Sequence, residues 1–244
     1  MSVAARNRTV HPATAGEPPA GFDRLDGIGV IKHLVPHESL ALEGDTADRL
    51  HRVLRGTIAG YKATADGRRQ ILTFFFPGDL VGLTVGERYA YSAEAIDHAS
   101  VRSVPHARLR ELAAQTPALQ ESLLSALRRE VAAAQERLLW LGRKTARERL
   151  AGFLLECDGR VGLHDKDGRR IVPLPMSQLE IGDYLGLASE TVSRALAELV
   201  RNGTIEIVRP FAGVIIRDHR CLECAADEGG PLPYSAPLYA GSKP

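Results

Sequence analysis

Apolar and polar positions follow a helical pattern most clearly over residues 177–203, where they predict two short helices joined by a tight turn. Ser177 and Glu180 form an S-x-x-E capping box, in which each side chain can satisfy a free backbone N–H of the other at the start of the first helix. Gly186 supplies the turn, and Ser189 is placed to cap the second helix. The segment therefore predicts a helix-turn-helix.

The second helix of this motif has one apolar and one polar face. Apolar residues recur at i, i+3, i+4, i+7 and i+8 and predict a buried stripe of Val192, Ala195, Leu196, Leu199 and Val200. The opposite face carries groups that donate or accept hydrogen bonds, namely Glu190, Thr191, Ser193, Arg194 and Arg201. A short helix with a packed back and a polar front fits the DNA major groove, so the motif predicts DNA binding.

A long helix is predicted over residues 117–142, with Thr116 as its cap, Pro117 in its first turn and Gly142 at its end. Its apolar residues recur with alternating spacings of three and four and form a heptad seam of Leu124, Leu127, Val131, Ala134, Leu138 and Leu141. The helix spans roughly 39 Å at 1.5 Å per residue. The seam could pack on the chain's own β domain, but a sustained heptad period favours a partner helix. We expect a homodimer.

Short β-like runs separated by turn residues precede this helix, between residues 21 and 104. The runs are Ser39–Leu42, Leu50–Leu54, Thr57–Lys62 and Arg68–Phe75. The Asp66-Gly67 pair suits a hairpin turn because both residues tolerate positive φ. Strands so short and so regularly spaced predict an antiparallel sandwich or jelly roll, also called a β-roll.

The segments around the helix-turn-helix complete a winged domain. A helix is predicted from Lys144 to about Cys157, followed by a Gly/Asp-rich hairpin over 159–171, and two strands joined by residues 209–212 are predicted at Thr204–Val208 and Gly213–Arg217. The fold class is α+β. The predicted organisation is a flexible arm (1–20), a β-roll (21–115), a dimerisation helix (116–142), a winged helix-turn-helix domain (143–220) and a flexible tail (221–244).

Composition and charge restrict the function classes. The 244 residues carry a net charge of +1, and residues 143–220 hold 13 Lys and Arg against 11 Asp and Glu, so DNA affinity must come from the placement of basic groups. No apolar run approaches the roughly 18–20 residues of a membrane span, and no signal peptide is apparent. Three cysteines make no disulfide framework. We expect a cytoplasmic protein.

The predicted β-roll, long helix and winged helix together resemble the CRP/FNR family of bacterial transcription regulators. The resemblance covers roughly residues 21–220, and its most specific parts are Leu139–Phe153 (LWLGRKTARERLAGF) and Leu174–Arg194 (LPMSQLEIGDYLGLASETVSR). The chain looks most like the FNR/FixK branch, whose recognition helix carries E-x-x-S-R. The resemblance implies a transcription activator of that branch, with double-stranded DNA and RNA polymerase as partners.

The E-x-x-S-R pattern falls on Glu190, Ser193 and Arg194. The resemblance implies that Glu190 and Arg194 contact the G·C pair of a TTG/CAA-type half-site, and that Ser193 touches a base edge or a phosphate. The chemistry suits these roles, because Arg donates bidentately to guanine and Glu accepts from cytosine N4. Alternatively, Glu190 and Arg194 form an i, i+4 ion pair on a solvated face.

Other side chains are candidates for the DNA backbone, and two recognition helices imply half-site centres roughly 34–36 Å apart. The phosphate candidates are Ser177, Ser189, Thr191, Arg143 and Lys144, with Arg147 beside them. The basic residues could equally be the solvated start of a helix.

The family's cyclic-nucleotide receptors hold ribose and phosphate with a Gly-Glu pair and, later, an Arg before Ser/Thr-Ala. Here the matching stretches are Gly82-Leu83-Thr84 and Tyr91-Ser92-Ala93, so leucine replaces the acid and tyrosine replaces the arginine. Arg88 leaves a rearranged anion site open, but a buried phosphate without a fixed cation is poorly compensated. We predict no cyclic nucleotide.

No cofactor is predicted. A four-cysteine iron–sulfur cluster cannot form within one subunit, because only Cys157, Cys221 and Cys224 are present. His219, Cys221 and Cys224 form an H-x-C-x2-C run that is a weak candidate for a metal site or a thiol switch. Haem, as in relatives that respond to nitric oxide or carbon monoxide, stays open through His33, His37, His51, His98 and His106.

An enzyme built on the β-roll, such as a metal-dependent cupin, is the alternative from another class. Cupin chemistry needs two or three His with a carboxylate at close strand spacing, which His98 and His106 do not offer. No Gly-rich phosphate loop or nucleophile elbow is apparent. We therefore expect no enzymatic activity, and the FixK-like branch implies a regulator of low-oxygen respiration, denitrification or nitrogen fixation that needs no ligand.

Overall fold

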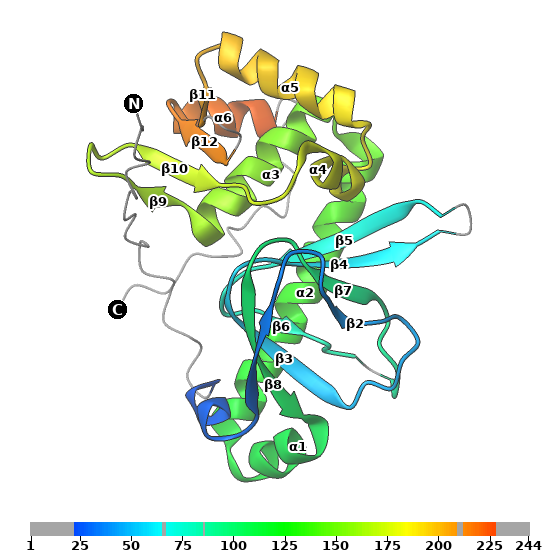
Figure 1. Cartoon of the computed structure of the whole chain (residues 1–244). Coiled ribbons are helices and arrows are strands. Elements are labelled where there is room, and N and C mark those ends of the chain that lie inside the picture. Colours follow the sequence, from blue (N-terminus) through cyan, green and yellow to red (C-terminus); the bar gives the residue numbers. More distant parts are fainter. Residues whose placement is uncertain (1–21, 65–66, 85, 209–211, 228–244) are drawn as a thin grey trace, which may run out of the picture.

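A computed structural model describes residues 22–64, 67–84, 86–208 and 212–227 of the protein. In this part of the chain a β lobe and a helical lobe are connected by one long helix, α2 (Pro117–Arg143) (Figure 1). The predicted arm (1–20), Asp66 of the predicted hairpin turn, and residues 228–244 lie outside the described residues.

The β lobe is the predicted β-roll, built from two four-stranded antiparallel sheets. The first sheet has the order β1-β8-β3-β6 and contains β1 (Val30–Leu34), β8 (Ala99–Pro105), β3 (Arg49–Arg55) and β6 (Leu80–Val81). The second has the order β2-β7-β4-β5 and contains β2 (Ser39–Ala41), β7 (Ser92–Ala95), β4 (Ile58–Ala63) and β5 (Arg69–Phe75). Their inward-facing residues, including Leu34, Val53, Ile58, Phe75 and Val101, form the core between the sheets.

Two short helical elements cover one end of the roll. They are the 3₁₀ helix η1 (Phe22–Gly27) and α1 (His106–Gln115), which the sequence analysis did not predict. Phe22 and Leu25 pack with Leu109 of α1 and Leu119 of α2 in a separate cluster. Helix α1 starts directly after β8, and Leu109 is its one fully buried residue in the described structure, so its periodic signal is weak.

Helix α2 begins at Pro117, as predicted, and ends at Arg143, one residue beyond the predicted end. Thr116 is the N-cap residue, as predicted, but its side chain makes no capping hydrogen bond. The helix buries Leu119, Ser122 and Trp140, whereas the face that carries the heptad seam is exposed.

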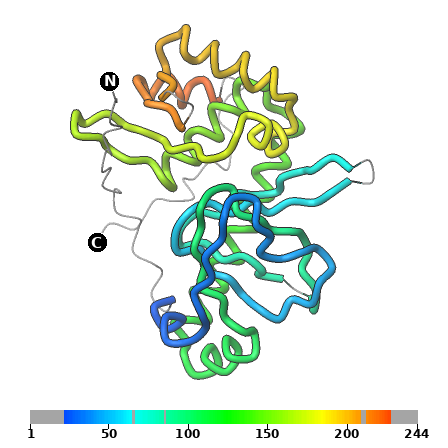
Figure 2. Tube along the Cα trace, in the orientation of Figure 1, coloured from blue at the N-terminus to red at the C-terminus, as the bar shows by residue number. Residues whose placement is uncertain are grey.

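The helical lobe is the predicted winged helix-turn-helix (Figure 2). Its helices are α3 (Ala146–Val161), α4 (Gln178–Leu185), α5 (Ser189–Arg201) and α6 (His219–Ala226). Its antiparallel sheet has the order β11-β12-β10-β9 and contains β11 (Ile205–Val208), β12 (Gly213–Ile216), β10 (Arg170–Pro173) and β9 (Leu163–His164). Residues 209–211, in the predicted connection of the wing, lie outside the described residues.

Helix α3 starts at Ala146 and is longer at its C-terminal end than predicted. Thr145 is its N-cap: the Thr145 hydroxyl accepts from the Glu148 N–H, and the Glu148 carboxylate accepts from the Thr145 N–H at 2.7 Å. This second capping box fixes the point at which the chain leaves α2.

Helix α6 contradicts the predicted flexible tail from residue 221. Leu222 is fully buried, Ala225 and Ala226 are buried beside it, and the Asp218 carboxylate caps the helix by accepting from the Cys221 N–H at 2.8 Å. Apolar residues at 222, 225 and 226 form one helical stripe that joins the core of the lobe. The Gly/Pro-rich composition of the following residues hid this short amphipathic segment.

Candidate nucleic-acid interface

The helix-turn-helix is held by the local features that the sequence predicts. The Ser177 N–H donates to Glu180 Oε2 at 2.7 Å, and the Glu180 N–H donates to Ser177 Oγ at 3.2 Å, so the capping box is confirmed. Gly186 ends α4 in the left-handed conformation (φ 65°, ψ 41°), which favours glycine. A Cβ on Gly182 would lie 2.5 Å from the Leu187 carbonyl oxygen, so the turn also requires glycine there.

Helix α5 packs its apolar face on the lobe with two differences from the prediction. Val192, Ala195, Leu196 and Leu199 are buried, but Val200 is exposed. Ala188, not Ser189, is the N-cap residue, because Ala188 keeps an extended backbone (φ −67°, ψ 148°) and Ser189 is already the first helical residue. The predicted cap by Ser189 is therefore wrong, although the helix starts where expected.

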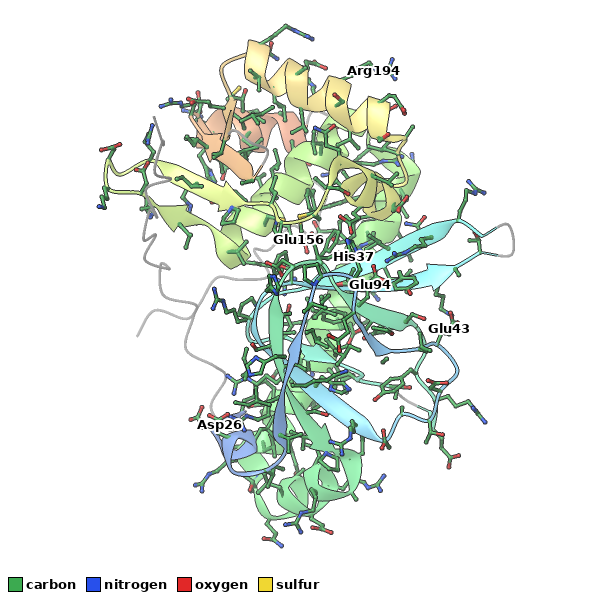
Figure 3. All side chains as sticks on the ribbon, viewed as in Figure 1. Asp26, His37, Glu43, Glu94, Glu156 and Arg194 are labelled. Carbon is green, nitrogen blue, oxygen red and sulfur yellow. The ribbon has the colours of Figure 1, made fainter. Side chains whose placement is uncertain are left out.

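The polar face of α5 carries Glu190, Ser193 and Arg194, all exposed. Figure 3 shows Arg194 on the side of α5 that faces away from the β-roll. The Arg194 guanidinium donates to Thr191 Oγ1 at 3.1 Å, and in the described structure no ion pair joins Arg194 to Glu190. Both side chains can therefore reach a groove without first breaking an ion pair between them.

The basic candidates for the DNA backbone divide into exposed and internally bound groups. Arg143 is exposed at the end of α2, and Arg201 is exposed at the end of α5. Lys144 donates to the Ala226 carbonyl at 2.8 Å and lies 3.6 Å from the Asp227 carboxylate, with a side chain only 13% exposed. Lys144 thus holds α6 against the end of α2, and we do not retain it as a phosphate contact.

The remaining phosphate candidates lie near the ends of the two motif helices. The Ser177 hydroxyl donates to Glu180 Oε2 at 2.8 Å, and Arg147 pairs with Glu198 of α5 at 3.3 Å. Ser189 and Thr191 lie half-buried in the first turn of α5. Of this set, Ser189 and Thr191 stay predictions as phosphate contacts at a helix N-terminus.

One residue that the sequence analysis missed fixes the start of this lobe. Arg149 of α3 donates to three carbonyl oxygens, those of Lys144 (3.0 Å), Leu185 (3.0 Å) and Leu141 (2.9 Å). It ties α2, α3 and the last turn of α4 together just before the recognition helix. No spacing rule marks Arg149, because its acceptors are backbone groups of three different elements.

A cavity of about 580 Å³ lies between the β-roll and α2. Leu83 and Tyr91, the residues that replace the family's acid and arginine, both line it, as does Glu130 of α2. Burial raises the pKa of Tyr91, and the Glu130 carboxyl raises it further. Burial also raises the pKa of Glu130.

The cavity lacks the two side chains with which the family's receptors hold a cyclic nucleotide. Arg88 is absent from the lining residues, and its guanidinium donates to the Gly44 carbonyl at 2.6 Å. At the position where the resemblance places the phosphate contact, the cavity offers the phenol of Tyr91 near the Glu130 carboxyl. The cations in the lining are Arg129 and Arg137 of α2 and Arg160 of α3, and none of them stands at the family's arginine position.

The candidate metal ligands do not converge. Within the described residues no group of three or more His, Cys, Asp or Glu side chains is close enough to hold a metal ion. His219 lies 3.5 Å from Asp158 and 3.3 Å from Glu223, while Cys221 contacts Thr204 and Cys224 is exposed. Cys157 is buried, and burial raises the pKa of its thiol.

The histidines of the β lobe are dispersed over different strands and loops. His33 Nδ1 lies 2.9 Å from Ser100 Oγ, and His37 lies 3.8 Å from the Glu94 carboxylate (Figure 3). His51 is buried, with Nε2 3.4 Å from the Tyr89 hydroxyl. His98 follows β7, and His106 follows β8. Among the described helices, none is long and apolar enough to cross a membrane.

Comparison with known proteins gives a consistent set of similarities. A model of the cyclic nucleotide-binding domain matches residues 31–116, and a model of the Crp-like helix-turn-helix domain matches residues 148–225. The chain is 36% identical over 207 residues to the nitrogen fixation regulation protein FixK of Bradyrhizobium diazoefficiens, covering 85% of this chain and 86% of that protein. It is 38% identical over 190 residues to the transcriptional activator protein FnrA of Stutzerimonas stutzeri, covering 76% and 77%. The solved structure of FixK2 from Bradyrhizobium japonicum superposes with a TM-score of 0.74 at 37% identity, covering 80% of this chain and 96% of that one.

Proposed function

The chain belongs to the CRP/FNR family of DNA-binding transcription regulators, and from that membership we propose that it activates transcription by binding a palindromic TTG–CAA-type operator as a homodimer. Its relatives are regulators such as FixK and FnrA, not enzymes. The observation that carries the proposal is the exposed row of Glu190, Ser193 and Arg194 on a helix whose opposite face packs on the lobe through four buried residues.

Base recognition rests on the geometry of α5. Arg194 is long enough to donate bidentately to guanine O6 and N7, while Glu190, one helical turn earlier, accepts from the paired cytosine. Ser193 lies between them on the same exposed surface. Thr191, which already accepts from Arg194 at 3.1 Å, would hold the guanidinium until it meets the base.

Dimerisation rests on the exposure of the heptad seam. Leu138 is 70% exposed, Val131 56% and Leu124 43%, a continuous apolar row along α2. Solvent-exposed heptad leucines on a helix of 27 residues favour a second copy of the same helix in a two-fold arrangement. The two recognition helices would then meet the two half-sites of one operator.

Independence from a small molecule rests on the residues of the cavity. Leu83 and Tyr91 stand where the family's receptors have the acid for the ribose and the arginine for the phosphate, and Arg137 and Arg160 of the lining are already bound to other groups of the protein. We therefore propose that the protein binds DNA without an effector and that its abundance sets its output. The name of the relative FixK supports a regulon of nitrogen fixation, and the resemblance to the FNR/FixK branch extends this proposal to low-oxygen respiration and denitrification, with RNA polymerase as the partner at the promoter.

The test is DNA binding by protein that has been freed of small molecules. Dissociation constants would be measured by fluorescence anisotropy on a duplex with a TTG–CAA palindrome and on a duplex of random sequence. We expect Arg194→Ala to weaken operator binding by about 1–3 kcal/mol, roughly 5- to 150-fold, and to relax the preference at the contacted base pair. Arg108→Ala, on the distant helix α1, serves as the matched control.

Two results would contradict the proposal. Equal losses on operator and random DNA would show that Arg194 contacts only phosphate. Wild-type protein that prefers the operator only after a nucleotide is added, or only with a Soret band in its absorption spectrum, would refute independence from a ligand.

A further inference from the structure

Arg137 of α2 lies at the junction of the two lobes and connects three elements. Its guanidinium donates to the Leu72 carbonyl oxygen of β5 and to the Tyr184 hydroxyl of α4. The guanidinium carbon also lies 3.9 Å from the centroid of the Tyr184 ring, in cation–π geometry. One side chain thus links the long helix, the β-roll and the first helix of the helix-turn-helix.

The link continues through half-buried charged groups. The Tyr184 hydroxyl donates to Glu156 Oε2 of α3 at 2.9 Å, and Arg160 lies 3.8 Å from Glu156 Oε1. Arg160 in turn pairs with Asp79 of the β-roll. Figure 3 shows Glu156 where the lobes meet. Burial raises the pKa of Glu156, and Arg137 and the Tyr184 hydroxyl oppose that rise.

We call these five residues the junction cluster: Arg137, Tyr184, Glu156, Arg160 and Asp79. Apolar contacts surround it, because Phe74 of β5 lies 5.1 Å from the Tyr184 ring and 6.1 Å from the Phe153 ring. The described hydrophobic core is continuous from Phe74 and Ile71 of the roll into α3 and α4. Gln70 of β5 also donates to the Asp183 carbonyl.

The position of this cluster matters because α4 leads directly through Gly186 into the recognition helix. Whatever fixes α4 on β5 also fixes the direction of α5 relative to α2, and α2 carries the heptad seam. The geometry of the junction therefore sets the distance between the two recognition helices of a dimer. The 580 Å³ cavity is also lined by Arg137, Arg160 and Asp79. Part of its wall is therefore formed by residues of the contact between the two lobes.

We propose that Arg137, Tyr184 and Glu156 are positioning residues, which hold the helix-turn-helix at one angle on the β-roll so that a ligand-free dimer presents its recognition helices at the operator spacing. The inference rests on the proposed function, because it requires a dimer on a two-part operator. It adds a structural explanation for DNA binding without an effector: contacts between the protein's own side chains fix the orientation of the helix-turn-helix.

Binding to operators that differ in the spacing of their half-sites distinguishes a positioning role of these residues from a purely stabilising one. A rigid pair of recognition helices accepts one spacing, because each inserted base pair shifts the second half-site by about 3.4 Å and rotates it by about 34–36° around the duplex. Loosely attached domains reach a wrong spacing more easily, but bind the right one more weakly because ordering them costs entropy on binding. A variant that is merely less stable binds both duplexes more weakly by the same factor.

The experiment compares the operator with the same operator lengthened by two base pairs between its half-sites. Dissociation constants are measured for dialysed wild type, Arg137→Met, Tyr184→Phe and the control Arg108→Met, an identical change on the distant helix α1. We expect Arg137→Met to bind the operator about tenfold more weakly, within the usual range of coupling between sites, and to lose most of the preference for the correct spacing. Tyr184→Phe keeps its ring and should lose less, while Arg108→Met should match wild type.

Circular dichroism and thermal unfolding show whether each variant is folded. A folded Arg137→Met that keeps the wild-type spacing preference, with or without weaker binding to both duplexes, overturns the inference and leaves the proposed function intact. If Arg137→Met does not fold, Tyr184→Phe decides by the same criterion. Wild type that does not distinguish the operator from random DNA refutes the proposed function and this inference with it.

Discussion

The heptad seam allows the energy of the proposed dimer to be worked from the structure. Full burial of a leucine side chain contributes about 1.5–3 kcal/mol, and Leu138 is 70% exposed, so a partner helix that covers it contributes about 1–2 kcal/mol. A two-fold dimer buries two copies, or about 2–4 kcal/mol. Removing this contact should raise the dimer dissociation constant roughly 30- to 1,000-fold.

The stronger perturbation is the double substitution Leu127→Glu and Leu138→Glu. It removes two apolar contacts per subunit and places like charges along both copies of the seam, where they repel each other. Leu127 and Leu138 are both exposed within one subunit, so the fold of the subunit should survive. We expect a monomer with an unchanged circular dichroism spectrum that no longer binds the operator specifically.

Sedimentation velocity at micromolar protein and gel shift on the palindromic operator provide the two measurements. Leu42→Glu is the matched control, because Leu42 is 49% exposed on the β-roll, outside α2, and receives the same new charge. An unchanged dimer mass together with an unchanged gel-shift midpoint in the double variant would refute the assignment of the seam to the dimer.

Two further predictions concern stability. Burial of the His51 ring lowers its pKa from 6.5 to about 4. Between these two pH values the imidazole is protonated in the unfolded chain but not in the folded protein. The free energy of unfolding should therefore fall by roughly 3 kcal/mol as the pH falls from about 6.5 to about 4. His51→Gln should flatten this part of the urea midpoint plotted against pH, and an identical slope in both proteins would contradict the assignment. Leu222→Ala should lower the free energy of unfolding by about 2–5 kcal/mol, because Leu222 is fully buried in α6, whereas Cys224→Ala on the exposed face should change it little. Equal effects of these two substitutions would mean that α6 does not pack as described.

Local patterns were sufficient to predict the helix-turn-helix. The Ser177–Glu180 capping box and the turn at Gly186 involve residues within one or two helical turns, and the structure reproduces both. The predicted burial of Val200 was wrong because eight residues at 100° each place it 80° from Val192, at the edge of the apolar stripe. Ser189 fails as a cap because a serine at the first helical position is hard to distinguish from a cap one residue earlier.

Patterns that depend on distant partners were not predictable. Lys144 has the charge and position of a phosphate contact, but its partners Ala226 and Asp227 lie more than 80 residues away in the sequence. Helix α6, which supplies them, was missed because three apolar positions before a Gly/Pro-rich stretch give a weak periodic signal. Because α6 was not predicted, the internal partners of Lys144 could not be predicted either.

The number of Lys and Arg residues says little about DNA binding by the helical lobe, because several of them are bound to distant groups of the protein itself. Arg149, Arg160 and Arg170 are bound within the protein, to backbone carbonyls, to Asp79 and to Asp158, and contribute to its architecture. Arg194 and Arg201 are exposed on the recognition helix. Because the net charge of the chain is only +1, non-specific attraction to phosphate supplies less of the affinity than in a strongly basic protein. In the proposed dimer, specific binding then depends on both half-sites being contacted at once, with the heptad seam joining two subunits and the junction cluster setting their angle.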